Sequence, residues 1–358
     1  MTGQFGFRGG RRRPVSAATA HWVQSTGALD FPYEVHPIEE VDLAGWVDEH
    51  PGVVDGWLAR HGAVLFTGFA VDLVTFSRVA TAVGGAALPY RERTTPRSEL
   101  TPGVYTSTEY PPDQRIPLHN ENAYQRCFPT RLVFCCLDAP HSGGATPVAD
   151  CRRVLARLAP AAVAGFRDRG VRYLRSFGDG AGLSWPEAFG TANRDQVEAY
   201  CREEAIDLHW RGAGGLRTAQ VRPALLRHPH HRQEVWFNHV NLFHVSALDR
   251  SLSDALTAQL GPDGVPLNVT YGDGTPIPAD LVAEIRAAYD AEAVAVAWRP
   301  GDVLVVDNLL VAHGREPFTG PRRIVVSMAG RHCHDLGALP NPSAASPPAT
   351  ADAGGDDR

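Results

Sequence analysis

The sequence predicts a mixed α/β protein, mainly β, with a double-stranded β-helix, or jelly roll, at its core and helices that flank it or are inserted into it. Many short strand-like segments closed by Gly and Pro turns in the second half predict the jelly roll, and helical patterns before and between them predict the helices. With 358 residues and 44% hydrophobic composition, the chain can form one large domain with a sizeable core.

We expect that domain to span residues 21–335. The stretch 1–20 is rich in Gly, Arg and small residues, and 336–358 is rich in Pro, Ala, Ser, Asp and Gly. Neither has the apolar content that would offset the entropy lost on ordering, so both tails are predicted to be disordered.

The first part of the domain is predicted to mix helices and strands. Apolar residues at helical spacing predict helices over 51–61 and 72–83, with Asp72 as N-cap of the second, and a strand over 63–67 lies between them. The run 131–137, rich in Val, Phe and Cys and followed by a Gly143-Gly144 turn, predicts a buried strand.

Inserted helices and then short strands are predicted for the rest of the domain. Helical patterns occupy 150–158, where Asp150 can cap, and also 161–168, 193–204 and 279–289. Strand patterns occupy 217–226, 234–240, 292–298, 303–307 and 322–329.

Composition argues against several classes of function. The net charge of −6, without a basic stripe, argues against nucleic acid, and the longest apolar run, 303–312, is interrupted by Asp307 and Asn308 and is too short for a membrane span. Walker A, G-x-S-x-G and G-x-G-x-x-G motifs are absent from the sequence. The cysteines show no C-x-x-C pair and no signal-peptide pattern is present, which favours a reducing cytoplasm.

The strongest functional signal is a set of metal-ligand residue types. Residues i and i+2 of a strand share a face, so His119 and Glu121 can point at one ion while Asn120 points away. His313 follows the apolar run 303–306 and can supply the third ligand from a distant strand. Two histidines and one carboxylate suit ferrous iron, because they leave three positions for a bidentate 2-oxo acid and O2.

A lone H-x-E is weak evidence in a chain with 15 histidines, but four segments in this order make the signal specific. They are IPLHNENAY (116–124), RLVFC (131–135), GGATPVAD (143–150) and DNLLVAHGREPFTGPRR (307–323). Together they resemble the TauD/TfdA family of iron(II)/2-oxoglutarate dioxygenases over about residues 60–330. The closer resemblance is to the clavaminate-synthase-like and SyrP-like branch, which uses Glu as the carboxylate ligand; VWFNHVNLFH (235–244) is also similar, with His239 where that branch typically has Gln.

The resemblance implies a role for each matching residue. His119, Glu121 and His313 would bind Fe(II), Arg323 would pair with the distal carboxylate of 2-oxoglutarate, and Thr146 would assist it. A guanidinium is planar and rigid, and two of its N–H groups can donate in parallel to the two oxygens of a carboxylate. Strand neighbours face opposite ways, so Arg322 would then be solvated. The implied reaction consumes O2 and 2-oxoglutarate and releases succinate and CO2.

The retained Glu121 favours hydroxylation over halogenation, because related halogenases lack this carboxylate. Substrate contacts are expected from six residues, each of which also fits core packing or a turn: Asn120, Asn122, Phe237, Asn238, His239 and Arg315. Arg315 could hold a carboxylate or a phosphopantetheine phosphate, so an amino-acid-like small molecule, free or bound to a carrier protein, is the first expectation.

The sequence leaves other functions and other metal sites open. A catabolic dioxygenase of a small sulfonate or aryloxy acid would use the same ligands, and a jelly roll can also bind a metal or ligand without turnover. The tract His228, His230 and His231 contains Pro229 and is flanked by Arg, which indicates an exposed turn more than a metal site. His332 and His334 share a strand face but have no evident third ligand.

Overall fold

The computed structural model describes residues 23–25, 31–89, 92–95, 97–178, 182–212, 214–248, 250–260 and 265–338. The predicted N-terminal tail, 1–20, lies outside these ranges, and so do 339–358 of the predicted C-terminal tail. The described chain continues past the expected domain end at residue 335 into a short 3-10 helix, η3 (Leu336–Ala338).

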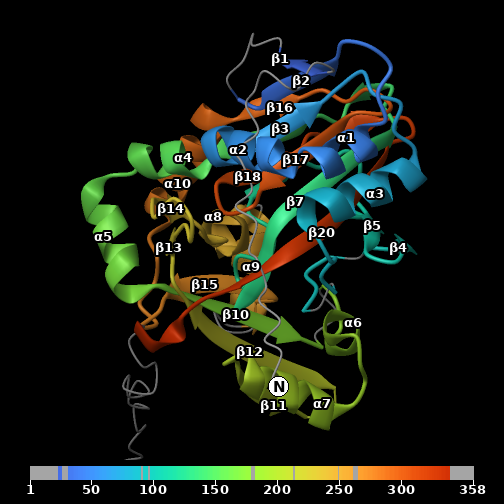
Figure 1. Ribbon diagram of the computed structural model, residues 1–358. Coiled ribbons are helices and arrows are strands. Elements are labelled where there is room, and N and C mark those ends of the chain that lie inside the picture. Colours follow the sequence, from blue (N-terminus) through green and yellow to red (C-terminus); the bar gives the residue numbers. More distant parts are fainter. Residues whose placement is uncertain are drawn as a thin grey trace, which may run out of the picture.

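An eight-stranded sheet forms one wall of the molecule (Figure 1), in the order β1-β2-β3-β17-β7-β20-β5-β4. Its strands are β1 (Val23–Ser25), β2 (Tyr33–Pro37), β3 (Ala63–Phe66), β4 (Glu99–Thr101), β5 (Val104–Thr106), β7 (Cys127–Asp138), β17 (Val303–Asp307) and β20 (Arg323–Cys333). The long strands β7 and β20 pair antiparallel along most of their length.

A four-stranded sheet of order β16-β9-β18-β6 faces the eight-stranded sheet. Its strands are β6 (Ile116–His119), β9 (Thr146–Asp150), β16 (Val294–Val296) and β18 (Val311–Arg315). Leu118 and Val311 from this sheet share one buried cluster with Leu132 and Val326 from the larger sheet. Two sheets packed over one core make the jelly roll that the sequence predicts, and that prediction is confirmed.

Alternation along the central strands separates two apolar cores. In β7 and β20, Phe134 and Val326 belong to the inner cluster, whereas Cys135 and Val325 belong to an outer cluster. Successive side chains of a strand point to opposite faces, so a strand buried on both faces is apolar throughout.

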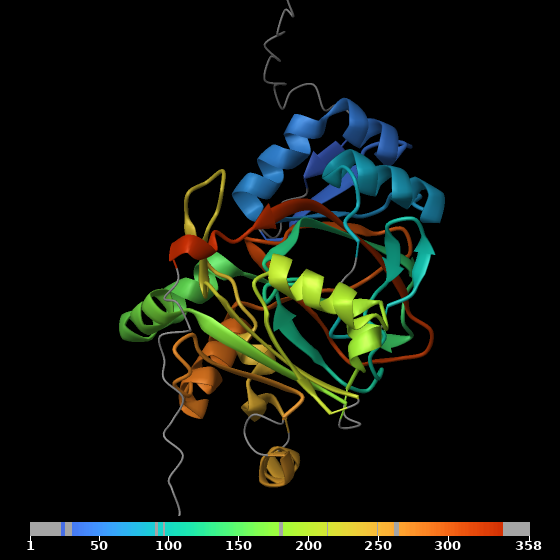
Figure 2. The same cartoon turned by 90° about the horizontal axis from the view of Figure 1, so that it is seen from below.

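Helices cover the outer face of the large sheet (Figure 2), where Phe66 lies in the outer cluster. They are α1 (Leu43–Glu49), α2 (Pro51–His61) and α3 (Leu73–Gly84). Asp72 caps α3 by accepting a hydrogen bond from the Thr75 backbone N–H at 2.8 Å. The predicted helices over 51–61 and 72–83 are confirmed.

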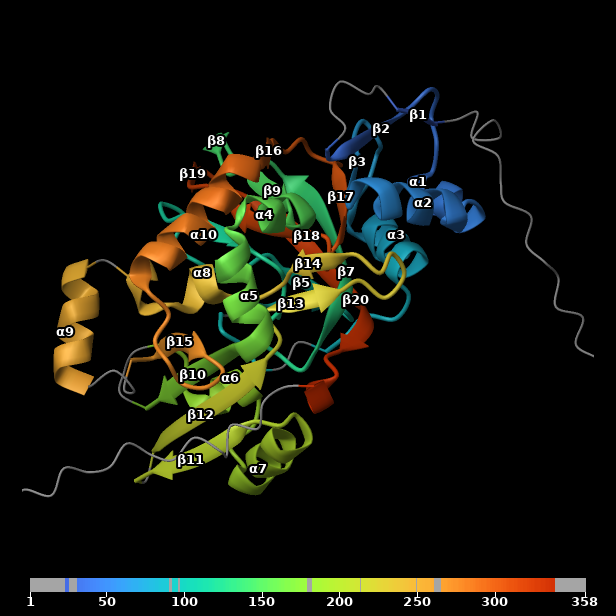
Figure 3. The ribbon, with the colours of Figure 1, turned by 90° about the vertical axis from the view of Figure 1, so that its left-hand side faces the viewer.

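A second unit of helices and strands is inserted between β9 and β16. Its helices are α4 (Cys151–Arg157), α5 (Pro160–Arg169), α6 (Trp185–Phe189), α7 (Arg194–Glu203), α8 (Val240–Phe243), η2 (Val245–Ala247), α9 (Arg250–Leu260) and α10 (Ala279–Glu292). Its sheet has the order β11-β12-β10-β15, with β10 (Val171–Phe177), β11 (Asp207–Arg211), β12 (Gly215–Arg222) and β15 (Leu267–Tyr271). Helix α9 projects from the body (Figure 3).

Two predicted strands end earlier than expected. The segment 217–226 is interrupted at Pro223, which cannot donate a ladder hydrogen bond, so β12 ends at Arg222 and β13 (Leu225–Arg227) follows. The segment 234–240 is a strand only in β14 (Glu234–Trp236), and the chain then turns into α8. The small strands β8 (Ser142–Gly143) and β19 (Phe318–Thr319) pair beside the Gly143-Gly144 turn.

Cys127 and Cys333 form a disulfide that joins the first residue of β7 to the last residue of β20. The sequence shows no C-x-x-C pair, and this pairing arises only because the two strands are antiparallel neighbours. Cys135, Cys136, Cys151 and Cys201 are buried free thiols. No helix in the described ranges is both long and apolar enough to cross a membrane.

Replacing Phe66 with Ala tests the outer core. Its ring is fully buried between β3 and the covering helices, so the change should lower the free energy of unfolding by about 3–5 kcal/mol, through lost transfer energy and a residual cavity. Denaturant titration measures the loss. Val74→Ala is the matched control, because 71% of Val74 is exposed, and a similar loss there would contradict the assignment.

Candidate metal and cofactor site

The pairing of β6 with β18 brings the predicted ligands together. His313 lies directly opposite His119 in the antiparallel register, although the two are far apart in sequence. Glu121 follows β6 in the turn beyond His119. At Gly314 a Cβ atom would lie 2.6 Å from the Ile116 carbonyl oxygen, so close approach of the two strands requires glycine beside His313.

The three side chains form a buried cluster whose ligand atoms all lie within 4.8 Å of one another. His313 Nε2 is 3.6 Å from Glu121 Oε2, and the His119 and His313 ring centroids are 4.6 Å apart. Among the described residues, this is the one group of three or more His, Cys, Asp or Glu side chains placed to hold a metal ion.

Both histidines are held in the form that binds metals. Burial lowers the pKa of His119 and lowers that of His313 well below its usual value, which keeps both imidazoles neutral. His119 Nδ1 donates to the Pro117 carbonyl at 2.8 Å, which leaves the Nε2 lone pair for an ion.

Asn308 fixes the backbone beside the cluster. Its amide oxygen accepts from the Glu121 N–H at 2.7 Å, and its amide nitrogen donates to the Glu121 and Pro129 carbonyls at 3.0 and 2.7 Å. Asn308 is fully buried, and its backbone carbonyl accepts from the Asn120 amide at 2.7 Å. The turn after β17 therefore holds the turn after β6 in place.

Arg97, which the sequence did not single out, forms a buried ion pair with Glu121. Its Nη2 donates to Glu121 Oε2 at 2.8 Å, and both side chains are about 5% exposed or less. Arg97 lies in an irregular segment before β4, where no periodic pattern could have indicated its position.

A cavity extends from the cluster to a second arginine, Arg322. Its guanidinium donates to the Gly144 carbonyl at 3.1 Å and approaches the Ser107 and Thr146 hydroxyls at 3.4 and 3.5 Å. Thr146 also accepts from Trp298 Nε1 at 2.9 Å. Burial, with a smaller contribution from Arg315, lowers the pKa of Arg322 to about 10.

The structure contradicts the expectation that Arg323 enters the barrel and Arg322 is solvated. Arg323 is exposed and pairs with Asp138 at 2.9 Å, whereas Arg322 and Ile324 line the cavity. Within β20 the even-numbered residues Ile324 and Val326 face the inner cluster, and Arg322, one residue before the strand begins, lies on the same side, at the cavity. The pairing of β20 with β7 is shifted by a bulge between Arg323 and Ile324, at the start of β20.

Three of the expected substrate contacts instead support the fold. Asn120 is fully buried and bonded to the Asn308 carbonyl, Asn238 donates to the Ala224 carbonyl at 2.9 Å, and Phe237 packs against Phe128 with centroids 4.6 Å apart. None of the three lines the cavity, so these expectations are corrected.

The other three expected substrate contacts lie closer to the cluster of His119, Glu121 and His313, but each has another role in the fold. His239 Nε2 is 2.6 Å from the Asn120 carbonyl, its ring lies 5.6 Å from that of His119, and burial lowers its pKa to about 3. Asn122 occupies a left-handed turn position with φ 57°. Arg315 lines the cavity, but its Nη atoms donate to the carbonyls of residues 110, 111 and 114.

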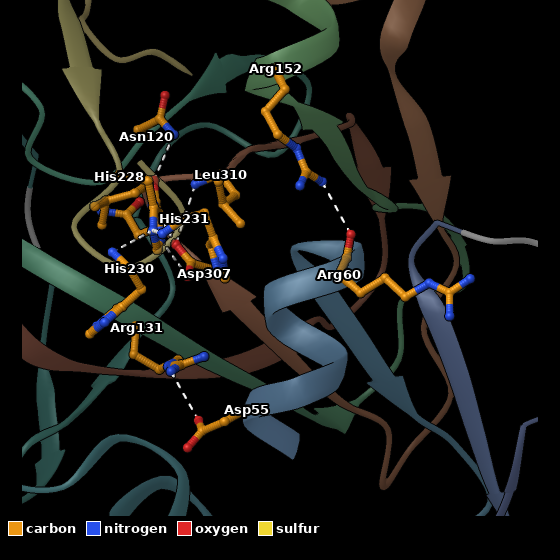
Figure 4. A network of polar contacts seen from close by, with 12 residues as sticks. Asp55, Arg60, Asn120, Arg131, Arg152, His228, His230, His231, Asp307 and Leu310 are labelled. Carbon is orange, nitrogen blue, oxygen red and sulfur yellow. Dashed lines mark hydrogen bonds and ion pairs between the residues drawn. The ribbon is translucent and has the colours of Figure 1, made fainter. Parts of the chain in front are cut away.

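The histidine tract forms a separate polar network (Figure 4). His228 is buried, with Nε2 3.2 Å from Asp307 Oδ2, and the backbone N–H groups of His230 and His231 approach its Nδ1 at 3.3 and 3.2 Å. The Leu310 N–H lies 3.3 Å from Asp307 Oδ1. The tract forms a turn as expected, but only part of it is exposed, because His228 is buried and contacts Asp307 beside Asn308.

The residues present fit a metal ion and an anionic co-substrate. Neutral buried histidines and a carboxylate form a three-sided donor set. Arg322 is a cation aimed into the same cavity, and none of the described carboxylates pairs with it, so it suits a carboxylate supplied by a ligand. A jelly roll with this site defines a class of enzyme, the oxygenases that use iron and 2-oxoglutarate.

The family is shown by comparison with known proteins. The model of the "Taurine catabolism dioxygenase TauD, TfdA family" matches residues 28–328, and the chain belongs to this family. The dapdiamide synthesis protein DdaC of Enterobacter agglomerans is 41% identical over 315 residues, which cover 88% of this chain and 90% of that protein. A clavaminate synthase-like protein of Arabidopsis thaliana is 35% identical over 286 residues, covering 77% and 83%.

Solved structures share the fold at low identity. The PvcB protein of Pseudomonas aeruginosa is 18% identical, with a TM-score of 0.50 over 84% of this chain and 86% of that one. A candidate α-ketoglutarate-dependent 2,4-D dioxygenase of Burkholderia xenovorans is 14% identical, with a TM-score of 0.51 over 86% and 96%.

Replacing Asn308 with Ala should destabilise the turn that carries Glu121. The change leaves the Glu121 N–H and two buried carbonyls without their partners, so the free energy of unfolding should fall by about 2–4 kcal/mol, and metal affinity should fall with it. Denaturant titration and Co(II) titration measure the two effects. Gln233→Ala, on the exposed turn, is the control, and an equal loss there would remove the special role of Asn308.

Proposed function

We propose that the chain oxidises a C–H bond of an amino-acid-derived small molecule in specialised metabolism, most simply by hydroxylation. His119, Glu121 and His313 bind Fe(II) in this proposal. The observation that carries it is the buried His-Glu-His cluster in one cavity with an arginine that none of the described carboxylates neutralises. The 41% identical relative, whose name refers to dapdiamide synthesis, supports the substrate class.

Arg322, rather than Arg323, binds the distal carboxylate of 2-oxoglutarate. Its guanidinium and the Thr146 hydroxyl face the same end of the cavity, and Trp298 orients Thr146 by donating to its oxygen. A charge-assisted pair in a buried site is stronger than one in water, so this end holds the co-substrate firmly.

The protein's own residues orient the reactants and exclude water. Bound iron with 2-oxoglutarate supplies O2 activation, in which 2-oxoglutarate is converted to succinate and CO2. Phe134, Ile116 and Ile324 form apolar walls of the cavity, which limit water near the metal centre. Which C–H bond is oxidised follows from how these walls and the flanking arginines place the substrate.

The same proposal has two finer parts. The substrate is either free or tethered to a carrier protein, and the protein acts in the cytoplasm. Neighbouring biosynthetic genes and an activity screen with free and carrier-bound amino acids address the first. The family membership of the chain argues against a jelly roll that binds its ligand without turnover.

Removing a metal ligand should abolish turnover. His119→Ala and Glu121→Ala each leave two protein ligands, so succinate formation with Fe(II), ascorbate and a substrate library should fall to background. His209→Ala, an exposed histidine in the inserted sheet, should retain wild-type turnover. Retained succinate formation in either ligand variant would rule out that ligand.

Arg322→Ala and Arg323→Ala form a matched pair that tests the co-substrate subsite. Loss of the buried cation should raise the 2-oxoglutarate KM roughly 30-fold or more, since removing one partner of such a pair costs about 2–5 kcal/mol. The Fe(II) requirement should change little. Arg323→Ala should leave the KM within about twofold because the side chain is exposed; the opposite pattern would contradict the assignment.

A further inference from the structure

The disulfide between Cys127 and Cys333 closes one end of the ladder formed by β7 and β20. The two residues lie directly opposite each other in the antiparallel register, as the last pair of that ladder. Both are only half-buried. The free thiols are all buried and belong to Cys135, Cys136, Cys151 and Cys201. A reagent in solution can therefore reach the disulfide while the free thiols are protected.

Arg331 places a positive charge beside one of the two sulfurs. It precedes Cys333 by two residues on β20 and is exposed, and its Nη2 donates to Cys127 Sγ at 3.1 Å. A neighbouring cation stabilises a thiolate, and a sulfur that is released more easily as a thiolate favours thiol–disulfide exchange. Attack by an external thiolate on Cys333 Sγ, with Cys127 as the leaving thiolate, is therefore the favoured route.

The start of β7, which the disulfide anchors, is also bonded to the turn that carries Glu121. Glu121 precedes Cys127 by six residues, and Pro129 follows Cys127 by two. Asn308 donates to the Pro129 carbonyl at 2.7 Å and makes two hydrogen bonds with the Glu121 backbone, at 2.7 and 3.0 Å. Asn308 thus connects the metal-ligand turn to the strand end that the disulfide holds.

Non-covalent contacts also hold the end of β20 against the start of β7. Phe128 packs against His332 and His334, with ring centroids 5.6 and 4.9 Å apart, and the His334 N–H donates to the Arg126 carbonyl at 2.9 Å. Opening the disulfide leaves contacts of this kind to close the ladder, and the ends of elements open at the lowest free energy. The turn that carries Glu121 then spends part of its time outside the arrangement that completes the metal cluster.

We propose that the disulfide of Cys127 and Cys333 is a redox-responsive clamp on the metal cluster of His119, Glu121 and His313. One thiolate of a dithiol reductant attacks Cys333 Sγ and expels Cys127 as a thiolate, and the second thiol of the reductant then displaces Cys333. The protein gains two electrons and two protons as its S–S bond breaks, and the reductant is oxidised to its own disulfide. Disulfides in a reducing compartment are mostly transient or redox-sensing, which agrees with the proposed cytoplasmic location.

Labelling of the native protein tests whether the clamp opens. Folded protein is incubated with dithiothreitol under argon, alkylated with iodoacetamide and mapped by peptide mass spectrometry. Cys127 and Cys333 should be alkylated, and the four buried thiols should not. A disulfide that dithiothreitol reduces only after unfolding in urea would overturn the proposal.

Mn(II) affinity tests what opening the disulfide does to the cluster. Dithiothreitol is removed by gel filtration, and free Mn(II) is measured by electron paramagnetic resonance for the reduced and the oxidised protein. Reduction should raise the Mn(II) Kd about 10-fold, because the apparent affinity falls with the fraction of molecules in the binding arrangement. Reoxidation with oxidised glutathione should restore the Kd. Equal Kd values for the two forms, or a loss that reoxidation does not reverse, would overturn the proposal.

Variants assign the effect to these residues. The double variant Cys127→Ser, Cys333→Ser should bind Mn(II) as weakly as the reduced wild type and should not respond to dithiothreitol. Arg331→Gln should slow reduction about threefold, because the leaving thiolate loses its cation. Arg323→Gln is the matched control, an exposed arginine at the other end of β20, and should retain the wild-type rate.

The contrary results are equally specific. Tight Mn(II) binding by the double variant, or an unchanged reduction rate in Arg331→Gln, would overturn the proposal. Should the double variant not fold, the comparison of reduced with oxidised wild type decides in its place.

Mn(II) binding by the oxidised wild type separates this inference from the proposed function. The reduction does not involve the metal, whereas its effect on the Kd rests on the metal site of the proposed function. If oxidised wild-type protein does not bind Mn(II), the proposed metal site fails and the clamp fails with it. Normal Mn(II) binding that is lost in His119→Ala but does not depend on the disulfide would overturn the clamp alone.

Discussion

The antiparallel pairing of β18 with β6 is the constraint on which the site depends. It sets His313 opposite His119 and, through the close approach at Gly314, keeps the two strands near enough for their imidazoles to share an ion. A shift of this pairing by one residue would turn one histidine to the other face of the sheet. The metal site is therefore a property of strand register as much as of residue identity.

Buried polar groups support that register from outside the cavity. Asn308 bridges the turns after β6 and β17, and Asp307 beside it contacts His228 of the β13–β14 hairpin. Each group is satisfied by a neighbour, so polar atoms in the core cost little and fix one arrangement. The chemistry of the site thus rests on side chains that never face the cavity.

The sequence predicted the jelly roll, and it predicted His119, Glu121 and His313, which the structure brings into one buried cluster. The expected shared strand face of His119 and Glu121 was wrong, because β6 ends at His119 and Glu121 lies in the turn that follows. It failed at the arginine pair, where motif spacing favoured Arg323, whereas Arg322, one residue before β20, lines the cavity beside the inward-facing Ile324. It also failed at Arg97, since a residue in an irregular segment is placed by the unit it packs against. Asn120 and Asn238 were predicted to contact substrate because a sequence does not reveal the buried backbone carbonyls to which they donate.

The two-faced strand β7 constrains how this protein can vary in length. Its residues alternate between the cavity-side core, which includes Phe134, and the helix-covered core, which includes Cys135, while both edges pair with neighbouring strands. A single-residue deletion within β7 would turn the side chains on one side of the deletion to the opposite face of the sheet. Residues of one core would then point into the other, and Phe134 could leave the cavity side. Insertions and deletions among homologues should therefore be tolerated in the connecting loops and excluded from this strand.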